Sequence, residues 1–133
     1  MDISQRFVDL GNKAASEEGL GDRVAFERGD ARGLNFIDEF DGVISLCEGA
    51  FGLQGGPAAS DIANLVGDQS VISGMAQALK GGGRLLLAAF SAYFQVAHGD
   101  ADSNDFDLMT GVRHEVTEIK DPDGRKASVD LWT

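Results

Sequence analysis

Hydrophobic positions in the first part of the chain follow a helical period. Ser4 is a good N-cap residue, small and apolar residues recur at helical spacing through residues 7–15, and Gly19 suits the position just after a helix end. We therefore predict a helix that begins after Ser4 and ends before Gly19. Residues 1–3 have the character of a strand end that runs directly into this helix.

Shorter apolar runs further along predict strands. Residues 43–46 and residues 84–90 are apolar runs of strand length, and such runs are typical of strands buried on both faces of a sheet. Residues 23–28 alternate between apolar and polar side chains, which predicts another strand, and it ends in the turn signal Gly29-Asp30. Each of these predicted strands is flanked by helical or turn-forming sequence.

The rest of the pattern completes an α/β plan. Residues 61–79 have helical spacing, with an interruption expected near Gly67, and glycines end that helix before the next strand. Residues 111–119 and 126–132 predict an antiparallel hairpin around a turn at residues 121–124. The expected fold class is α/β, with a mainly parallel sheet, flanking helices and a C-terminal antiparallel hairpin in a single domain over residues 1–133.

Composition limits the classes of function. With 133 residues and 43% hydrophobic side chains, the chain is long enough for one core and too short for two. A net charge of −11 argues against a broad nucleic-acid surface, which requires clustered Lys and Arg. Cys47 is the single cysteine, no apolar segment approaches the ~20 residues that span a bilayer, and no secretory leader is visible. We expect a cytoplasmic protein with no membrane partner.

The order of four short segments resembles the class I S-adenosylmethionine-dependent methyltransferase family. In chain order they are Asp2-Ile3-Ser4, Gly29-Asp30-Ala31-Arg32, Phe40-Asp41-Gly42-Val43-Ile44-Ser45 and Ala78-Leu79-Lys80-Gly81-Gly82-Gly83-Arg84-Leu85. None is specific alone, but together they cover most of the chain in the family's order and spacing. The resemblance implies a Rossmann-like fold, S-adenosylmethionine as cofactor, and methyl transfer to a small-molecule acceptor.

The resemblance also implies roles for residues at strand ends. Asp2 occupies the position whose carboxylate hydrogen-bonds the ribose hydroxyls, and Ile3 lies beside the adenine. Asp30 matches the residue that receives the adenine amino group, and Ala31 supplies a backbone contact. An ionised carboxylate accepts hydrogen bonds and donates none, which suits both acidic residues for these roles.

The end of the central strand is assigned to the methionine portion of the cofactor and to the acceptor. Ser45, Leu46 and Cys47 match that position. Methyl transfer from a sulfonium is an in-line displacement with an activated leaving group, so the protein mainly aligns the partners and excludes water. A general base is needed only if the acceptor must lose a proton, and Glu48 is the nearest candidate by sequence. Apart from the resemblance, we expect Cys47 to be a small buried hydrophobic residue.

The sequence departs from the family at its start. The family's first strand and its glycine-rich loop precede the position where this sequence begins, and that strand lies in the middle of the family's sheet. The glycines at residues 81–83 lie between a helix and a strand, the reverse of the order that a nucleotide loop needs. We therefore expect a domain truncated at the N-terminus, and at the C-terminus where Thr133 still has a strand pattern, or a homo-oligomer in which a second subunit completes the sheet.

Other interpretations remain open. The chain fits a non-catalytic remnant or interaction module that keeps the fold without cofactor binding, or a generic nucleotide-binding protein, although no phosphate loop is visible. The acidic segment at residues 100–111 departs from a calcium loop at the positions that need Gly and Glu, and no His or Cys spacing predicts a metal site. Phe90, Tyr93 and Phe94 suit an acceptor pocket or a core equally well.

Overall fold

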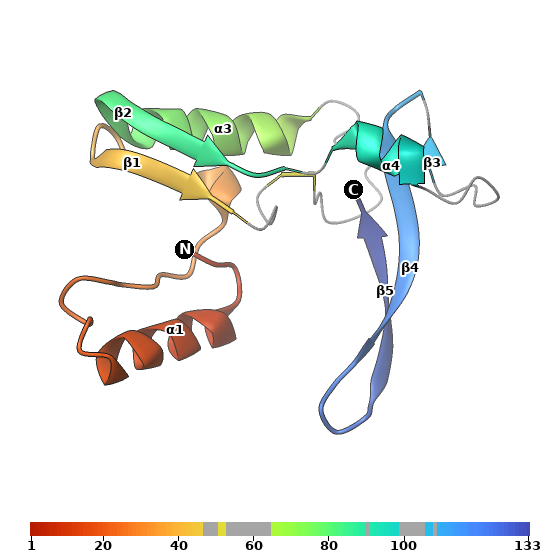
Figure 1. Cartoon of the computed structure of the whole chain (residues 1–133), viewed down its shortest axis with the longest axis horizontal. Coiled ribbons are helices and arrows are strands. Elements are labelled where there is room, and N and C mark those ends of the chain that lie inside the picture. The colour runs from red at the N-terminus through yellow and green to blue at the C-terminus, as the bar shows by residue number, and fades with distance from the viewer. Residues whose placement is uncertain (47–50, 53–64, 90, 99–105, 108) are drawn as a thin grey trace.

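The computed structural model describes the greater part of the chain, namely residues 1–46, 51–52, 65–89, 91–98, 106–107 and 109–133. Its elements, in chain order, are α1 (Gln5–Glu17), the 3₁₀ helix η1 (Ala31–Gly33), β1 (Phe40–Ser45), α3 (Val66–Ala78), β2 (Leu79–Leu87), α4 (Ala92–His98), β3 (Phe106–Asp107), β4 (Val112–Lys120) and β5 (Lys126–Trp132) (Figure 1). The described part is a mixed α/β structure with a two-stranded parallel sheet and a three-stranded antiparallel sheet.

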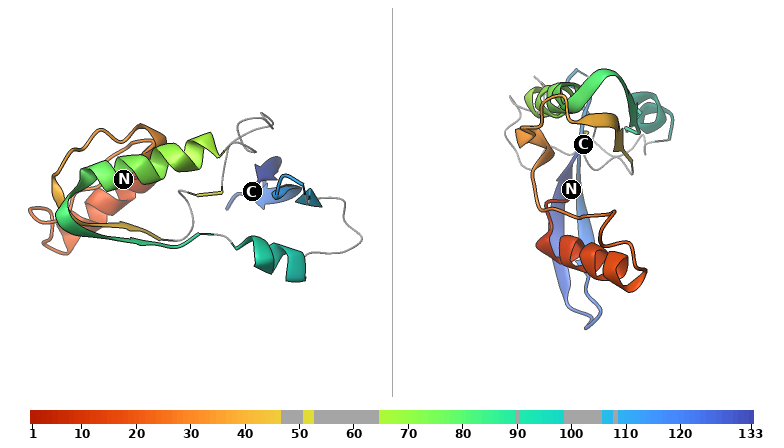
Figure 2. Two further views of the ribbon diagram at one scale, coloured as in Figure 1. Left: turned by 90° about the horizontal axis from the view of Figure 1, so that it is seen from above. Right: turned by 90° about the vertical axis from the view of Figure 1, so that its left-hand side faces the viewer.

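The parallel sheet consists of β1 and β2, which α3 connects along the chain. The register runs from Gly42 opposite Arg84 to Ser45 opposite Leu87. α3 lies along one face of this sheet (Figure 2) and contacts both strands. Of the helix predicted over residues 61–79, α3 covers the part from Val66 onward. Leu65 just before it has a positive φ of 53°, and residues 61–64 lie outside the described residues.

The core of this unit is small. Phe51, Val71 and Met75 form its buried cluster, and partly buried apolar side chains pack against them: Ala31, Leu34, Val43 and Leu85. The prediction that both strands are buried on both faces is wrong, since Ile44 and Leu86 are 68% and 61% exposed. α3 covers one face, whereas α1 lies well apart from α3 and β1 (Figure 1).

The N-terminal helix forms as predicted. The Ser4 hydroxyl accepts a hydrogen bond from the backbone N–H of Phe7 at 3.5 Å, and α1 begins at the next residue after Ser4. Gly19 adopts a positive φ of 69° just past the helix, the left-handed conformation that glycine adopts most easily. The local signals at both ends of the helix are therefore confirmed.

The strand predicted at residues 23–28 is wrong except at its end. Only Arg28 pairs, in an isolated parallel bridge with Asp2. The side-chain amide of Asn12 takes both backbone groups of Phe26, donating to its carbonyl and accepting from its N–H at 2.8 Å each. An amide side chain from α1 thus replaces the strand partner that Phe26 would need.

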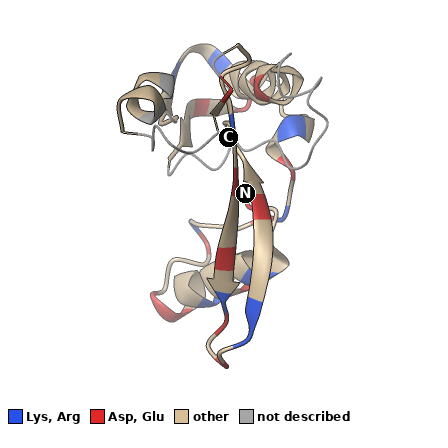
Figure 3. Ribbon diagram, turned by 90° about the vertical axis from the view of Figure 1, so that its right-hand side faces the viewer, with Lys and Arg blue, Asp and Glu red and all other residues tan. Residues whose placement is uncertain are grey.

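The C-terminal hairpin is confirmed, with β4 and β5 paired from His114 opposite Trp132 to Lys120 opposite Lys126. β3 extends this antiparallel sheet beside β4. Acidic and basic residues lie near the hairpin tip (Figure 3), where Lys126 of β5 and Glu118 of β4 form a diagonal ion pair at 2.7 Å. The expectation of an α/β fold with a parallel sheet and a C-terminal antiparallel hairpin is therefore confirmed in these coarse terms for the described residues, and the hairpin with β3 forms a sheet of its own.

Candidate functional site

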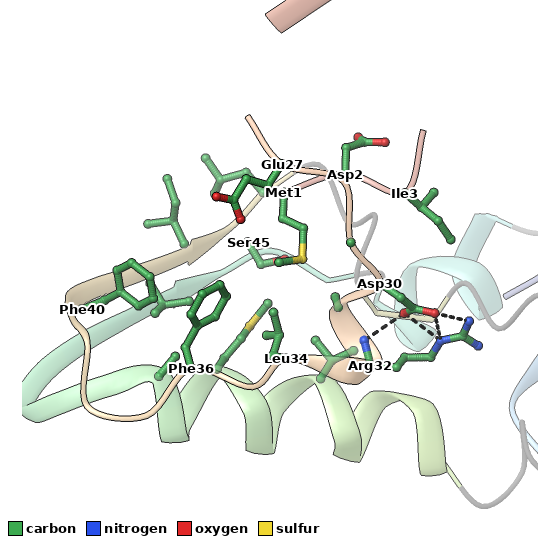
Figure 4. A pocket seen from close by; sticks show the side chains of 18 of the residues that line it. Met1, Asp2, Ile3, Glu27, Asp30, Arg32, Leu34, Phe36, Phe40 and Ser45 are labelled. Atoms are coloured by element: carbon green, nitrogen blue, oxygen red, sulfur yellow. Dashed lines mark hydrogen bonds and ion pairs between the residues drawn. The ribbon is translucent and has the colours of Figure 1, made fainter. Parts of the chain in front are cut away.

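A cavity of about 980 Å³ lies between the N-terminal segment and β1 (Figure 4). Its apolar side is formed mainly by η1, α3 and the residues that follow η1, whereas its polar groups come from the segment of the Asp2–Arg28 bridge and from the end of β1. Clefts of this size are typical of small-molecule sites. The predicted site residues among the described ones all line it: Asp2, Ile3, Asp30, Ala31, Ser45 and Leu46. Cys47 and Glu48 lie outside the described residues.

The parallel bridge brings the two predicted acidic residues to the same wall of the cavity. Asp2 donates its backbone N–H to the Glu27 carbonyl and accepts from the Gly29 N–H, both at 3.0 Å. The Met1 side chain lies directly over Gly29, where an added Cβ would stand 2.5 Å from the Met1 sulfur. Glycine at this position therefore allows Met1 to reach into the cavity, toward Ser45 in Figure 4.

Asp30 is held by Arg32 in a bidentate contact. The Arg32 Nε lies 3.0 Å from both carboxylate oxygens, Nη2 lies 2.6 Å from Oδ2, and the Arg32 backbone N–H donates to Oδ1 at 2.9 Å. These hydrogen bonds from Arg32, with its positive charge, lower the pKa of Asp30 from 3.8 to about 2, and the same contact raises the pKa of Arg32. Asp30 is therefore a carboxylate at neutral pH, and part of its accepting capacity is already used.

Asp2 presents a different geometry. Its Oδ1 accepts the backbone N–H of Ser4 at 2.7 Å, at the start of α1, while its second oxygen makes no hydrogen bond to the described residues. Figure 4 shows the Asp2 carboxylate directed away from Asp30 and Ser45. In this conformation the carboxylate does not point into the cavity, and a side-chain rotation would be needed to bring it to the interior.

The end of β1 forms the opposite wall. Ser45 is only 8% exposed, and its backbone carbonyl accepts the Ala88 N–H at 2.8 Å. Leu46 follows and is exposed. The ends of parallel strands are where α/β proteins gather ligand-binding groups, which agrees with the position of Ser45.

Several lining residues were not anticipated from the sequence as part of the site, among them Arg32, Leu34, Phe36 and Met75. Arg32 carries a signal in the sequence, because an arginine two residues after an N-capping aspartate is placed to pair with it. The apolar residues carry no such signal, since their helical and strand spacing is that of any core. Tyr93 and Phe94 are exposed on α4 and do not line this cavity, and Phe90 lies outside the described residues.

Other classes of site are not indicated in the part of the chain that the structure describes. There, no group of three or more His, Cys, Asp or Glu residues is placed to hold a metal ion. No described helix has the length and apolar character needed to cross a membrane. In comparisons with known proteins, the chain matches no protein-family model, no curated protein and no solved structure.

Proposed function

We propose that the cavity binds S-adenosylmethionine and that the chain serves methyl transfer to a small-molecule acceptor in a Rossmann-like arrangement. One observation carries the proposal. Residues that are far apart in the sequence, and that were assigned to one cofactor by their order alone, line a single cavity: Asp2, Ile3, Asp30, Ala31, Ser45 and Leu46.

The chemistry of the lining fits an adenosyl ligand. The two carboxylates accept hydrogen bonds from ribose hydroxyls and an adenine amino group, and the low pKa of Asp30 keeps it ionised at neutral pH. The apolar side chains of Leu34, Val71 and Met75 supply a surface for an aromatic base. Ser45 marks the end of β1, where the methionine portion and the acceptor would meet.

The first test is calorimetric titration of the chain with S-adenosylhomocysteine. We expect saturable binding, weakened about tenfold to a hundredfold by Asp30→Ala, since hydrogen bonds to charged groups contribute about 1.5–3 kcal/mol. Asp123→Ala is the matched control, because this carboxylate lies in the hairpin turn outside the cavity. A folded chain that releases no heat, or equal effects of the two substitutions, would contradict the proposal.

A second candidate is a binding module that has kept the α/β arrangement without the cofactor. The bidentate contact of Asp30 with Arg32 favours it, since a carboxylate whose oxygens are satisfied within the chain needs no ligand. Arg32→Gln separates the two functions. If Asp30 binds the cofactor, Arg32→Gln leaves S-adenosylhomocysteine binding in place or strengthens it. If the chain is a binding module without the cofactor, Arg32→Gln only loosens η1, and no S-adenosylhomocysteine binding appears.

A further inference from the structure

We infer that the methyl acceptor is a small amine, which the cavity holds with its nitrogen between Glu27 and Ser45. This step rests on the proposed function and names its substrate class. Glu27 was not expected from the sequence as a site residue, yet it lines the cavity together with Ser45. The two residues come from distant segments, because Glu27 precedes the bridge residue Arg28 and Ser45 ends β1.

The Ser45 hydroxyl is a buried polar group that lacks a partner. The residue is only 8% exposed, and its side chain makes no hydrogen bond to any residue that the structure describes. No described side-chain N or O atom is both fully buried and without a partner, so this hydroxyl has access to the cavity that Ser45 lines. A buried hydroxyl is favourable only when it is hydrogen-bonded, so its position indicates a polar group on the ligand.

The Glu27 carboxylate is available to the same ligand. Among the described residues it forms neither an ion pair nor a side-chain hydrogen bond. Figure 4 shows it directed toward the side of the cavity where Ser45 lies. An ionised carboxylate only accepts hydrogen bonds, and a serine hydroxyl accepts as well as donates. A ligand nitrogen that carries N–H groups can therefore bond to both.

The charge of the lining opposes an anionic acceptor. Within the described lining, Arg32 is the one cationic side chain, and its guanidinium already holds Asp30 in a bidentate contact. The carboxylates of Asp2 and Glu27 add negative charge. A carboxylate or phosphate on the acceptor would meet like charges and no free cationic side chain, whereas a nitrogen that becomes positive meets charges of opposite sign.

The reaction that follows is methylation of nitrogen. The acceptor reacts as the neutral amine, after its ammonium proton has passed to water. The nitrogen lone pair forms the bond to the methyl carbon, while the carbon–sulfur bond breaks and its electron pair stays on sulfur. The nitrogen becomes positive and the sulfonium becomes a neutral thioether. The Glu27 carboxylate stabilises the positive charge that develops on nitrogen in the transition state.

The cavity offers separate places for the two substrates. In Figure 4, Asp30 and Arg32 lie at one end, and Glu27 and Ser45 lie away from them. An adenosyl group bound at Asp30 therefore leaves the Ser45 side for the reacting atoms. A volume of about 980 Å³ is near the upper limit for small-molecule sites, which leaves room for a small acceptor beside the cofactor.

Three matched probes test the class of acceptor. Benzylamine, benzyl alcohol and benzoate share one ring and differ in the charge and hydrogen-bond donors of the attached group. Each is titrated by amide-resolved NMR into the chain saturated with S-adenosylhomocysteine. We expect shifts at Glu27 and Ser45, with benzylamine bound about tenfold more tightly than benzyl alcohol and benzoate bound most weakly. Any other order of affinities would overturn the inference, whereas a chain that does not bind S-adenosylhomocysteine would contradict the proposed function itself.

Substitutions locate the amine within the cavity. Glu27→Gln should weaken benzylamine binding about tenfold and leave benzyl alcohol binding unchanged, and Ser45→Ala should weaken binding of both probes. Glu18→Gln removes the same charge just after α1, outside the cavity, and is the matched control. Equal effects of the two glutamate substitutions on benzylamine would mean that only overall charge matters, and would overturn the inference.

The cofactor has an amino group of its own, so a second comparison separates the two sources of a bound amine. Methylthioadenosine lacks the amino-acid part of S-adenosylhomocysteine. If Glu27 holds the acceptor, Glu27→Gln leaves the affinities of both adenosine ligands unchanged. Weakened binding of S-adenosylhomocysteine alone would assign Glu27 to the amino group of the cofactor and overturn its assignment to the acceptor.

Discussion

The parallel and antiparallel sheets of this chain differ in how their strands are brought together. β4 and β5 pair along seven successive residue pairs and are joined by a short turn. Among the described residues β1 pairs with β2, and several residues of β1 line the cavity. An antiparallel hairpin is closed by contacts between neighbours in sequence, whereas a parallel sheet depends on segments brought together from a distance. The cavity is accordingly lined by segments that lie far apart in the sequence and meet in the parallel unit.

The two regions also differ in what holds them together. The parallel unit relies on a few buried side chains, with Val71 only 1% exposed at the centre of the α3 contact. The hairpin relies on pairing and on surface contacts, such as His114 bonded to Asp130 at 2.8 Å and stacked on Trp132 at a ring separation of 3.9 Å. A change in one region is therefore expected to leave the other region largely intact.

The largest effect is expected from Val71→Asp, because it places a carboxylate in the core of the parallel unit without a partner. We expect a loss of about 3–5 kcal/mol, enough to unfold α3. Far-UV circular dichroism measures the helix, and fluorescence of Trp132, the only tryptophan, reports on the hairpin. Ile119→Asp is the control at a position on β4 that is 53% exposed and lies opposite Ala127, and it should change neither signal. Simultaneous loss of both signals in Val71→Asp would show that the regions fold as one unit.

A smaller effect is expected where α3 meets the residues after η1. At Gly74 an added Cβ would stand 2.8 Å from the Cβ of Leu34. Gly74→Ala should therefore displace α3 and cost about 1–2 kcal/mol in urea unfolding, after the better helix propensity of alanine is counted. Gly81→Ala, where nothing lies within 4 Å, is the control. If Gly74→Ala instead made the chain more stable, the Leu34 side chain would have to move aside from the new methyl group without strain.

The hairpin has its own sensitive position in its turn. Gly124 has a φ of 85°, which a residue with a Cβ adopts only with strain, and its N–H bonds to the Asp121 carbonyl at 3.0 Å. We expect Gly124→Ala to destabilise the hairpin by about 1 kcal/mol and to shift the Trp132 transition alone. Gly124→Asn should recover part of the loss, because asparagine tolerates this conformation. A shift of the α3 transition would contradict the separation of the two regions.

The smallest effect concerns the ion pair in the site. Because the folded pKa of Asp30 is about 2 and its ordinary value is 3.8, its contribution to stability is present above about pH 4 and is lost as the pH falls toward 2. Arg32→Gln should return the pKa of Asp30 toward 3.8, as measured by NMR titration of the carboxyl carbon. Asp107 is the control in the antiparallel sheet, since its pKa is lowered by hydrogen bonds from Met109 and Thr110 instead. An unchanged Asp30 titration would show that Arg32 does not hold it.

Features set by neighbours in sequence could be predicted. The cap at Ser4, the glycine after α1 and the hairpin turn depend on residues a few positions apart, and all three formed as expected. The strand predicted at residues 23–28 did not form, because the side-chain amide of Asn12 on α1 hydrogen-bonds both the N–H and the carbonyl of Phe26. The short helix α4 was missed although Ser91 precedes it as an N-cap residue, with its hydroxyl accepting the Phe94 N–H at 3.4 Å.

In the candidate site, too, some features could be predicted from the sequence and others could not. The ends of strands carry recognisable polar residues, so the gathering of Asp2, Asp30 and Ser45 at one cavity could be anticipated from their order. The direction of the Asp2 carboxylate and the exposure of β1 could not, because both depend on which segments pack around them. Burial is a property of the whole fold, and an apolar run does not reveal whether a second layer covers it.

The measurement that tests the proposed function most directly is an amide-resolved NMR titration of the folded chain with S-adenosylhomocysteine. The account predicts saturable shifts at Ile3, Ala31 and Leu46, which line the cavity, and none at Val116 and Ile119 in the hairpin. Absence of shifts at the cavity residues, or shifts confined to the hairpin, would contradict it.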